Sequence, residues 1–319
     1  MKKTALLLFV LCFAVISTTQ LFSQQNAEDE KFQKLLDSYF DAYWKFYPTA
    51  ATLAGFNKYN DKLEDFREKT IDKRRDEMDK FNKEIVVDID SKSLSPDFQI
   101  DHALIVNALD IDVMQHEMLV PWEYNPLFHN TILMNCIRAI FTEGSAPTEA
   151  QAKNAESRLK DLEKFINEAK KNLKTPAEIY TQTAIKQFPT IQNFYKNELP
   201  GIIDQAPESV KAKLQVNLAK IIPALDDYQN FLQNELLPRS TGGFRLVEAH
   251  ARLVRTSFQN NIPVQELVAQ AQADTKNIRN EMFKNCFAIY KIMDPVFDIE
   301  KPPANLSEDQ LYYLSLIHI

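Results

Sequence analysis

Residues 148–178 read TEAQAKNAESRLKDLEKFINEAKKNLKTPAE, and this stretch decides the fold class. Its large apolar residues recur at intervals of three or four, which is the spacing of one face of an α-helix. They are Leu159, Leu162, Phe165, Ile166, Ala169 and Leu173. Thr148 followed by Gln151 predicts a capping box, in which each side chain bonds the other residue's backbone N–H. The stretch therefore predicts a long amphipathic helix with a defined start.

A second helix start follows at once. Thr175 is a suitable N-cap, Pro176 fits the first turn, and the Glu178 side chain can reach back to the cap. Two antiparallel helices joined by so short a link form a helical hairpin. We therefore predict that the helix behind Thr148 and the helix behind Thr175 pack against each other, with Leu162 in their shared core.

Comparable apolar stripes recur along the rest of the chain. They lie at residues 28–47, 68–83, 95–118, 207–236 and 263–290. The chain has only five glycines, and each lies where we expect a helix to break. The run IVVDID at 85–90 is the one strand-like segment, and we interpret it as a loop or a lone edge strand. These patterns predict an all-α fold, a single elongated multi-helix domain built of antiparallel helical hairpins.

The first residues have the organisation of a secretory signal peptide. Lys2 and Lys3 provide the basic start, and residues 4–16 form an apolar run too short to span a bilayer comfortably. We predict that residues 1–23 are the signal peptide. Cys12 has no small residue directly before it, which argues against a lipoprotein site. Since no later segment is long and apolar enough to span a bilayer, we expect an exported protein, periplasmic or extracellular, with no stable membrane insertion after cleavage.

Charge and cysteine usage exclude several functions. Signal cleavage removes two of the 37 basic residues and none of the 44 acidic ones, so the net charge falls from −7 to −9. This charge excludes nucleic acid as a partner. Cys136 and Cys286 remain, and neither belongs to a CxxC pair, which excludes zinc fingers and thioredoxin-type chemistry. The two cysteines can form a disulfide or stay as two buried thiols, and the sequence leaves both alternatives open.

The stretch QHEMLVP at 115–121 contains half of a zinc-peptidase motif. In HExxH, two histidines four residues apart bind one zinc ion, and the Glu between them acts as general base. Here Val120 replaces the second His, so we expect no metal at His116 and Glu117 and interpret the stretch as a solvated helix end. The other histidines do not form spaced pairs either. We therefore predict no catalytic residue, no metal ligand and no cofactor in this chain.

Two stretches offer candidate substrate contacts. In VPWEYNPLFH at 120–129, the side chains of Trp122, Tyr124 and Asn125 can form the rim of a peptide or sugar cleft. The alternative is a connector between helices whose aromatic residues fill the core. Arg245 can bind a substrate carboxylate through two hydrogen bonds. The alternative for Arg245 is an ion pair with a neighbouring Glu or a contact with a helix end.

Several segments occur in an order that resembles a known family. They are YPTAATLAGFNKYNDKL at 47–63, WEYNP at 122–126, AESRLKDLEKFINEAKKNLKTP at 155–176, AIKQF at 184–188 and LLPRSTGGFRL at 236–246. Together they resemble the bacterial "domain of unknown function 885" family over residues 30 to 290. The resemblance implies an exported, largely helical protein similar to zinc metallopeptidases of the gluzincin type. It also implies an HExxH helix in the C-terminal half, and no residue of this chain matches that helix.

The end of the chain is expected to be truncated. A helix start near Ser307 is followed by few residues, and LSLIHI at 314–319 resembles a non-native tail. We expect residues 24–313 to form the helical N-terminal part of the family domain, as a cleft wall or lid. The resemblance implies zinc and a peptide substrate for the intact protein, whereas this chain alone is expected to be inactive. The alternative is a non-catalytic helical binding or scaffold protein of the cell envelope.

Overall fold

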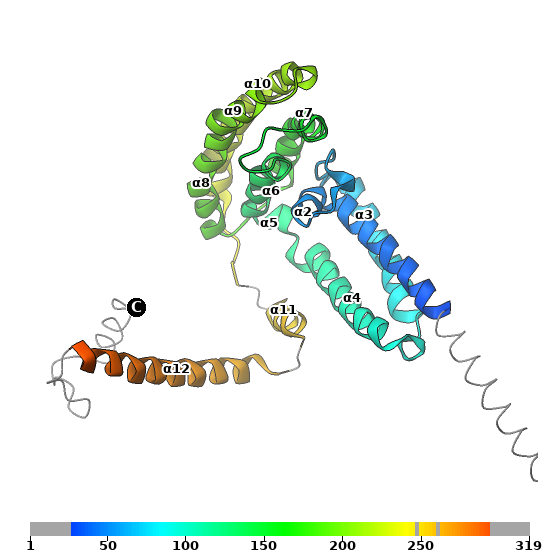
Figure 1. The fold of residues 1–319 in the computed structure, drawn as a ribbon, viewed down its shortest axis with the longest axis vertical. Coiled ribbons are helices and arrows are strands. Elements are labelled where there is room, and N and C mark those ends of the chain that lie inside the picture. Colours follow the sequence, from blue (N-terminus) through cyan, green and yellow to red (C-terminus); the bar gives the residue numbers. More distant parts are fainter. Residues whose placement is uncertain (1–26, 246–248, 260–261, 294–319) are drawn as a thin grey trace, which may run out of the picture. The chain divides into compact units, whose positions relative to one another are not determined.

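The computed structural model describes residues 27–245, 249–259 and 262–293, with side chains described up to residue 282. The predicted signal peptide at 1–23 and the predicted tail at 314–319 lie outside the described residues. Within that part of the chain, α-helices and short helical turns account for the regular structure (Figure 1). The all-α prediction is confirmed.

The chain divides into two compact units, Met1–Leu253 and Val254–Ile319, although the sequence favoured one domain. In the first unit the helix at 27–46 is followed by α2 (Pro48–Leu53), η1 (Asn57–Tyr59), α3 (Glu68–Phe81), η2 (Asn82–Val87), η3 (Ser91–Ser93), α4 (Pro96–Met114), η4 (Gln115–Leu119), α5 (Pro121–Tyr124), α6 (Pro126–Arg138), α7 (Glu149–Asn172), α8 (Glu178–Asn193), η5 (Phe194–Glu198), α9 (Leu199–Asp204), α10 (Glu208–Phe231), η6 (Leu232–Leu236) and η7 (Leu237–Arg239). α11 (Ala249–Phe258) crosses the division, and α12 (Val264–Met293) belongs to the second unit.

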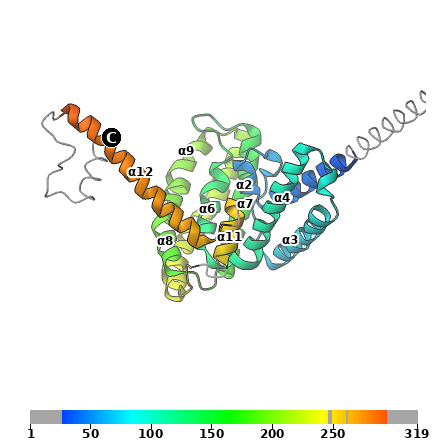
Figure 2. The ribbon, with the colours of Figure 1, turned by 90° about the horizontal axis from the view of Figure 1, so that it is seen from below.

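Two apolar cores hold the first unit together. The smaller core joins the helix at 27–46 to α3 and α4, and it contains Phe32, Leu36, Tyr39, Phe81, Ile85, Ile89, Leu94, Ile105 and Leu109. α3 and α4 lie side by side in both views (Figures 1 and 2). The larger core is formed mainly by α6 to α10 and η6. Burial of these amphipathic faces is what stabilises helices of this length.

The helix at 148–172 forms as its sequence predicts. Thr148 and Gln151 make both hydrogen bonds of the capping box at the start of α7. The predicted stripe is buried, and the Leu162 side chain has no exposed surface. The prediction of this helix and of its apolar face is therefore confirmed.

The predicted partner of this helix is wrong. α7 packs along its length against α10, whereas α8 packs against α6 and α10, and α7 and α8 share no extensive interface. The link between them explains this, because it is held in an extended conformation from both sides. The Lys174 N–H donates to the Glu123 carbonyl at 2.9 Å, and Arg239 donates to the Leu173 carbonyl at 3.0 Å.

The N-cap of the second helix also differs from the prediction. α8 begins at Glu178 with Ala177 as its N-cap, and no side chain caps it, so Thr175 is not the cap. The Pro176 carbonyl instead accepts a hydrogen bond from the Gly242 N–H at 3.0 Å. A Cβ at residue 242 would lie 2.3 Å from the Thr175 carbonyl oxygen, so this approach requires glycine.

Three further expectations need correction. The run at 85–90 is not a strand: residues 85–87 end the π-helical turn Asn82–Val87, which continues α3, and residues 88–90 form the loop that follows. Gly201 lies inside α9 rather than at a break, although Gly55 and Gly144 do have the positive φ angles of chain turns, 81° and 74°. In the second unit, the predicted apolar stripe of α12 is not buried among the residues whose side chains are described, and Ile278 is 59% exposed.

Cys136 is a free, buried thiol on α6. Its Sγ lies 3.4 Å from the Tyr195 hydroxyl, which donates to the Leu133 carbonyl. Burial raises the pKa of the Cys136 thiol to about 12, so it stays protonated at neutral pH. The Cys286 side chain lies outside the described residues.

Shortening the Leu162 side chain tests the packing of α7 directly. Leu162→Ala is expected to lower the free energy of unfolding by about 2–5 kcal/mol, because Leu162 is fully buried and its loss leaves a cavity. Val216→Ala on α10 is the matched control, since Val216 is 55% exposed, and it is expected to cost less than about 0.5 kcal/mol. Chemical denaturation of both variants would contradict this packing if the two losses were equal.

Candidate functional site

A cleft lies between the helix at 27–46, α4 and the α5–α6 segment. Its volume is about 730 Å³, which falls within the roughly 300–1,000 Å³ of ligand pockets. Six aromatic side chains line it, and we call it the aromatic cleft: Tyr39, Phe40, Tyr43, Trp44, Tyr47 and Phe128. Its lining also includes the polar residues Asp112, Gln115, Asn125 and Thr131.

One helix supplies most of the aromatic rings. Tyr39, Tyr43 and Tyr47 are spaced four residues apart, so they project from one face of the helix and its end. The Tyr39 and Tyr43 ring centroids lie 5.9 Å apart, and those of Tyr43 and Tyr47 lie 5.1 Å apart. Phe128 contributes a ring from α6 on the other side. The three tyrosine rings therefore lie against one another in a row.

A buried ion pair lies next to these rings. Arg74 on α3 and Asp112 on α4 are 1% and 3% exposed, and the Arg74 Nη2 donates to the Asp112 carboxylate. The Arg74 guanidinium carbon also lies 5.8 and 5.7 Å from the ring centroids of Tyr39 and Tyr43. These cation–π contacts add to the attraction of the carboxylate and partly replace the water that Arg74 loses.

His116 is buried beside this ion pair, so its interpretation as part of a solvated helix end is wrong. Its side chain has no exposed surface, and Nε2 lies 3.3 Å from the Tyr47 hydroxyl and 3.7 Å from Asp112. Burial, with help from the charge of Arg74, lowers the pKa of His116 to about 3. The imidazole is therefore neutral at pH 7. Glu117, the second residue of the motif, and Met118 are exposed.

Val120 explains why the helix cannot continue into a zinc motif. Its φ and ψ angles of 37° and 60° are left-handed, and Pro121 begins the next helix. A β-branched residue is costly in this conformation. α5 and α6 follow this turn, and residues of both line the cleft.

Asn125 is the predicted contact residue that lines the aromatic cleft. It is the N-cap of α6, and its side-chain oxygen accepts from the Leu127 N–H at 3.0 Å. Trp122 is instead 1% exposed and stacks on Phe66, with ring centroids 5.7 Å apart. Of the two predicted contact residues Trp122 and Asn125, Asn125 thus lines the aromatic cleft and Trp122 does not, and most of the lining was not predicted.

Tyr124 and Arg245 lie elsewhere. Tyr124 is 41% exposed, and the Lys174 amine lies 6.0 Å from its ring centroid. Arg245 is exposed, with its guanidinium carbon 5.7 Å from the ring of its neighbour Phe244. Neither belongs to the lining of the aromatic cleft.

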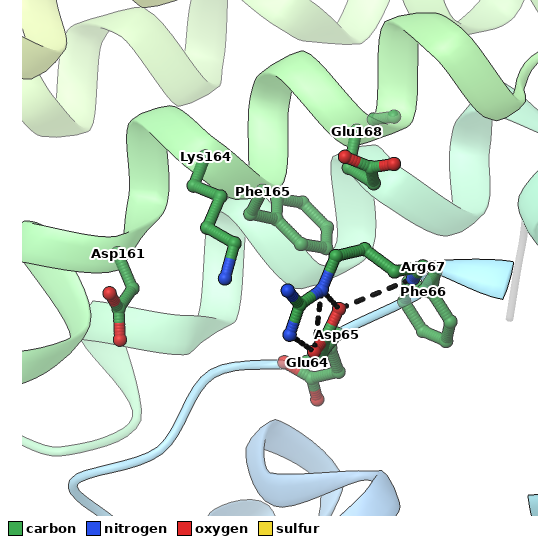
Figure 3. Close-up of a pocket in the computed structure, with 9 residues that line it drawn as sticks. Glu64, Asp65, Phe66, Arg67, Asp161, Lys164, Phe165 and Glu168 are labelled. Atoms are coloured by element: carbon green, nitrogen blue, oxygen red, sulfur yellow. Dashed lines mark hydrogen bonds and ion pairs between the residues drawn. The ribbon is translucent and has the colours of Figure 1, made fainter. Parts of the chain in front are cut away.

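A smaller, charged pocket lies between residues 64–67 and α7 (Figure 3). Its volume is about 120 Å³, about a sixth of that of the aromatic cleft. Arg67 binds Asp65 through two nitrogens, and the buried Glu64 accepts from both the N–H and the hydroxyl of Thr49. Arg67, Asp65 and Glu64 are therefore already paired within the protein. For this reason the aromatic cleft is the better candidate for a ligand site.

The sequence analysis missed Arg74 and Asp112. A signal was present, because Arg74 is in phase with the buried Ile71, Met78 and Phe81 of α3. A charged residue at a core position of a stripe indicates a buried partner.

No three side chains of His, Cys, Asp and Glu converge as metal ligands among the described residues. These residues therefore do not fit a zinc ion, and the expectation of zinc in the intact protein stays a prediction. None of the helices in the part of the chain that the structure describes is long and apolar enough to cross a membrane.

The fold and the site define an all-α protein with an aromatic, ligand-sized cleft. The chain belongs to the family described as "Bacterial protein of unknown function (DUF885)", whose model matches residues 48–313. A search of curated proteins found no match.

One similar solved structure is "The structure of a putative lipoprotein of unknown function from Shewanella oneidensis". The TM-score is 0.73 at 18% identity, and the match covers 89% of this chain and 51% of that chain. This similarity shows the fold, and the chain spans about half the length of the structure it matches.

Removing one partner of the buried ion pair should destabilise the protein strongly. Asp112→Asn leaves Arg74 buried without its counter-charge, and we expect a loss of about 3–5 kcal/mol in the free energy of unfolding. Asp72→Asn is the matched control, because it breaks the Asp72–Arg75 pair on α3, whose side chains are 58% and 46% exposed. The control should cost less than about 1 kcal/mol. Similar losses in both variants, measured by chemical denaturation, would show that the Arg74–Asp112 pair is not buried.

The buried histidines predict acid sensitivity. The pKa of His116 is about 3 in the folded protein and 6.5 in the unfolded chain, so the unfolded chain binds a proton first as the pH falls. The free energy of unfolding should therefore decrease from pH 6.5 toward pH 3. His129, whose pKa burial lowers to about 4, adds to the same effect.

The histidine contribution can be isolated by substitution. His116→Gln should reduce the slope of stability against pH in this window, because it removes the buried imidazole. An unchanged slope in His116→Gln would contradict the burial of a neutral imidazole.

Proposed function

We propose that this chain is the N-terminal helical part of an exported metallopeptidase-like protein and that the aromatic cleft is one wall of its peptide-binding site. The proposal places the HExxH zinc site in a C-terminal half that this sequence does not include. Family membership supports a shared architecture. The match to about half of a longer chain is consistent with a second half.

The aromatic cleft is the observation that carries this proposal. It has the volume of a ligand pocket, and rings from two sides line it. Aromatic surfaces of this kind bind peptide side chains, because they offer large apolar contact area at little cost in conformational entropy. The ion pair and His116 behind the rings fix α3 and α4 against the helix at 27–46.

The residues of this chain would bind and orient the peptide and exclude water from it. In the intact protein, zinc would supply a Lewis acid and activate the water that attacks the peptide carbonyl. The described residues supply no group for that step. The alternative, a non-catalytic binding protein of the cell envelope, would use the same cleft without hydrolysis.

Expression of the whole reading frame that contains this sequence tests the proposal. The longer protein should hydrolyse a quenched fluorescent peptide library, and a zinc chelator should abolish the activity. This chain alone should hydrolyse nothing and retain no stoichiometric zinc.

Two outcomes would contradict the proposal. Peptide binding by the longer protein without chelator-sensitive hydrolysis would favour the binding or scaffold protein. Chelator-sensitive hydrolysis by this chain alone, lost in His116→Ala, would place the metal at the QHEMLVP stretch instead.

A further inference from the structure

We infer that the aromatic cleft takes an uncharged apolar side chain, aromatic by preference, from a peptide segment. This inference deepens the proposed function and rests on the cleft's being a peptide site. It follows from three properties of the lining: its charge, its hydrogen bonding and the occupancy of its ring faces.

The lining carries no unbalanced charge. Asp112 is the one charged residue among those that line the cleft, and Arg74 neutralises it from behind. A carboxylate or an ammonium group entering the cleft would lose its water and meet no counter-charge. Charged side chains are therefore excluded.

Two of the six lining rings already contact a cation. The Arg74 guanidinium lies over Tyr39 and Tyr43 at 5.8 and 5.7 Å, so a second cation at these rings would be repelled. Tyr39 and Tyr43 are therefore poor sites for lysine, arginine or a quaternary ammonium group. Neutral rings and aliphatic groups can still pack against the exposed edges.

Hydrogen bonding distinguishes a peptide side chain from a sugar. A sugar needs many polar partners, but three polar groups of this lining already have partners inside the protein. The Asn125 oxygen accepts from Leu127, the Thr131 hydroxyl donates to the Leu127 carbonyl, and the Tyr47 hydroxyl lies against His116. These three groups are therefore less able to replace the water that sugar hydroxyls would lose.

The geometry of the rings suits an aromatic guest. Tyr43 and Trp44 meet edge to face, with centroids 4.9 Å apart and planes at 76°, so the lining presents both faces and edges. An inserted phenyl ring can make the offset and edge-to-face contacts that aromatic pairs prefer. An aliphatic side chain gains only the burial of its surface.

The test uses neutral peptides that differ at one residue. N-acetylated, C-amidated and fluorescently labelled peptides of glycine and alanine would carry a central Phe, Leu, Lys or Glu, and fluorescence anisotropy would measure their binding to this chain. The Phe peptide should bind about tenfold tighter than the Lys and Glu peptides, with Leu between them. Equal or tighter binding of Lys or Glu, or preferential binding of a labelled chito-oligosaccharide, would overturn the inference.

Substitutions inside and outside the cleft lining show where the peptide binds. Phe128→Ala and Trp44→Ala should each weaken binding of the Phe peptide about fivefold or more, because both rings line the cleft. Tyr124→Ala is the matched control, an exposed aromatic outside the lining, and it should bind as the parent does. Equal binding by all three variants would place the site elsewhere. Circular dichroism would confirm that each variant is folded.

Different results would refute the peptidase proposal and the inference that the cleft is selective. If the peptide preference is found but the longer protein does not hydrolyse peptides, the selective cleft stands and the peptidase proposal fails. If the longer protein is a peptidase that cleaves substrates with Phe, Lys and Glu equally well at every subsite, the peptidase proposal stands and the selective cleft fails.

Discussion

The buried guanidinium of Arg158 is the interaction on which the first unit depends. Its side chain has no exposed surface, and it donates to the carbonyls of Lys62, Cys136, Pro48 and Tyr59 and to the Thr52 hydroxyl. Pro48 is the first residue of α2, which Tyr47 separates from the helix at 27–46, and Cys136 lies on α6. One side chain on α7 therefore joins α2 to α6, and both helices contribute residues to the lining of the aromatic cleft. The planar fork of arginine donors makes this possible, and lysine could not replace it.

Arg74 is a second buried arginine, and it lies beside the tyrosine rings of the aromatic cleft. Arg74 neutralises Asp112 and packs on the tyrosine rings, so the lining is both rigid and electrically balanced. Burial of each guanidinium costs solvation free energy, and the ion pair and ring contacts of Arg74 offset this cost only in part, because its Nε and Nη1 atoms have no hydrogen-bond partner. Both arginines have the same consequence for the aromatic cleft. Each holds elements that line the cleft in place, and neither leaves an unbalanced charge in the lining.

Local features of the fold could be predicted from the sequence, whereas the contacts between distant segments could not. The stripe and capping box of α7 depend on residues a few positions apart, and both formed as expected. The pairing of α7 with α10 depends on which faces meet in space, and periodicity does not encode that. Arg74 and Arg158 were overlooked because hydropathy patterns assign charged residues to the surface. For the site, Asn125 was predicted and lines the cleft, but Tyr39 and Tyr43 belonged to a stripe used only to predict a helix, and Trp44 was not singled out.

The two tryptophans allow one measurement to test the central claim that the aromatic cleft is the ligand site. Trp44 lines the cleft, and Trp122 is 1% exposed in the core against Phe66. A two-dimensional proton–nitrogen NMR spectrum resolves their indole N–H signals, assigned with Trp44→Phe, during titration with the neutral Phe peptide. The account predicts a saturable shift of the Trp44 signal and little change at Trp122. Binding of the peptide with no change at Trp44 would contradict it.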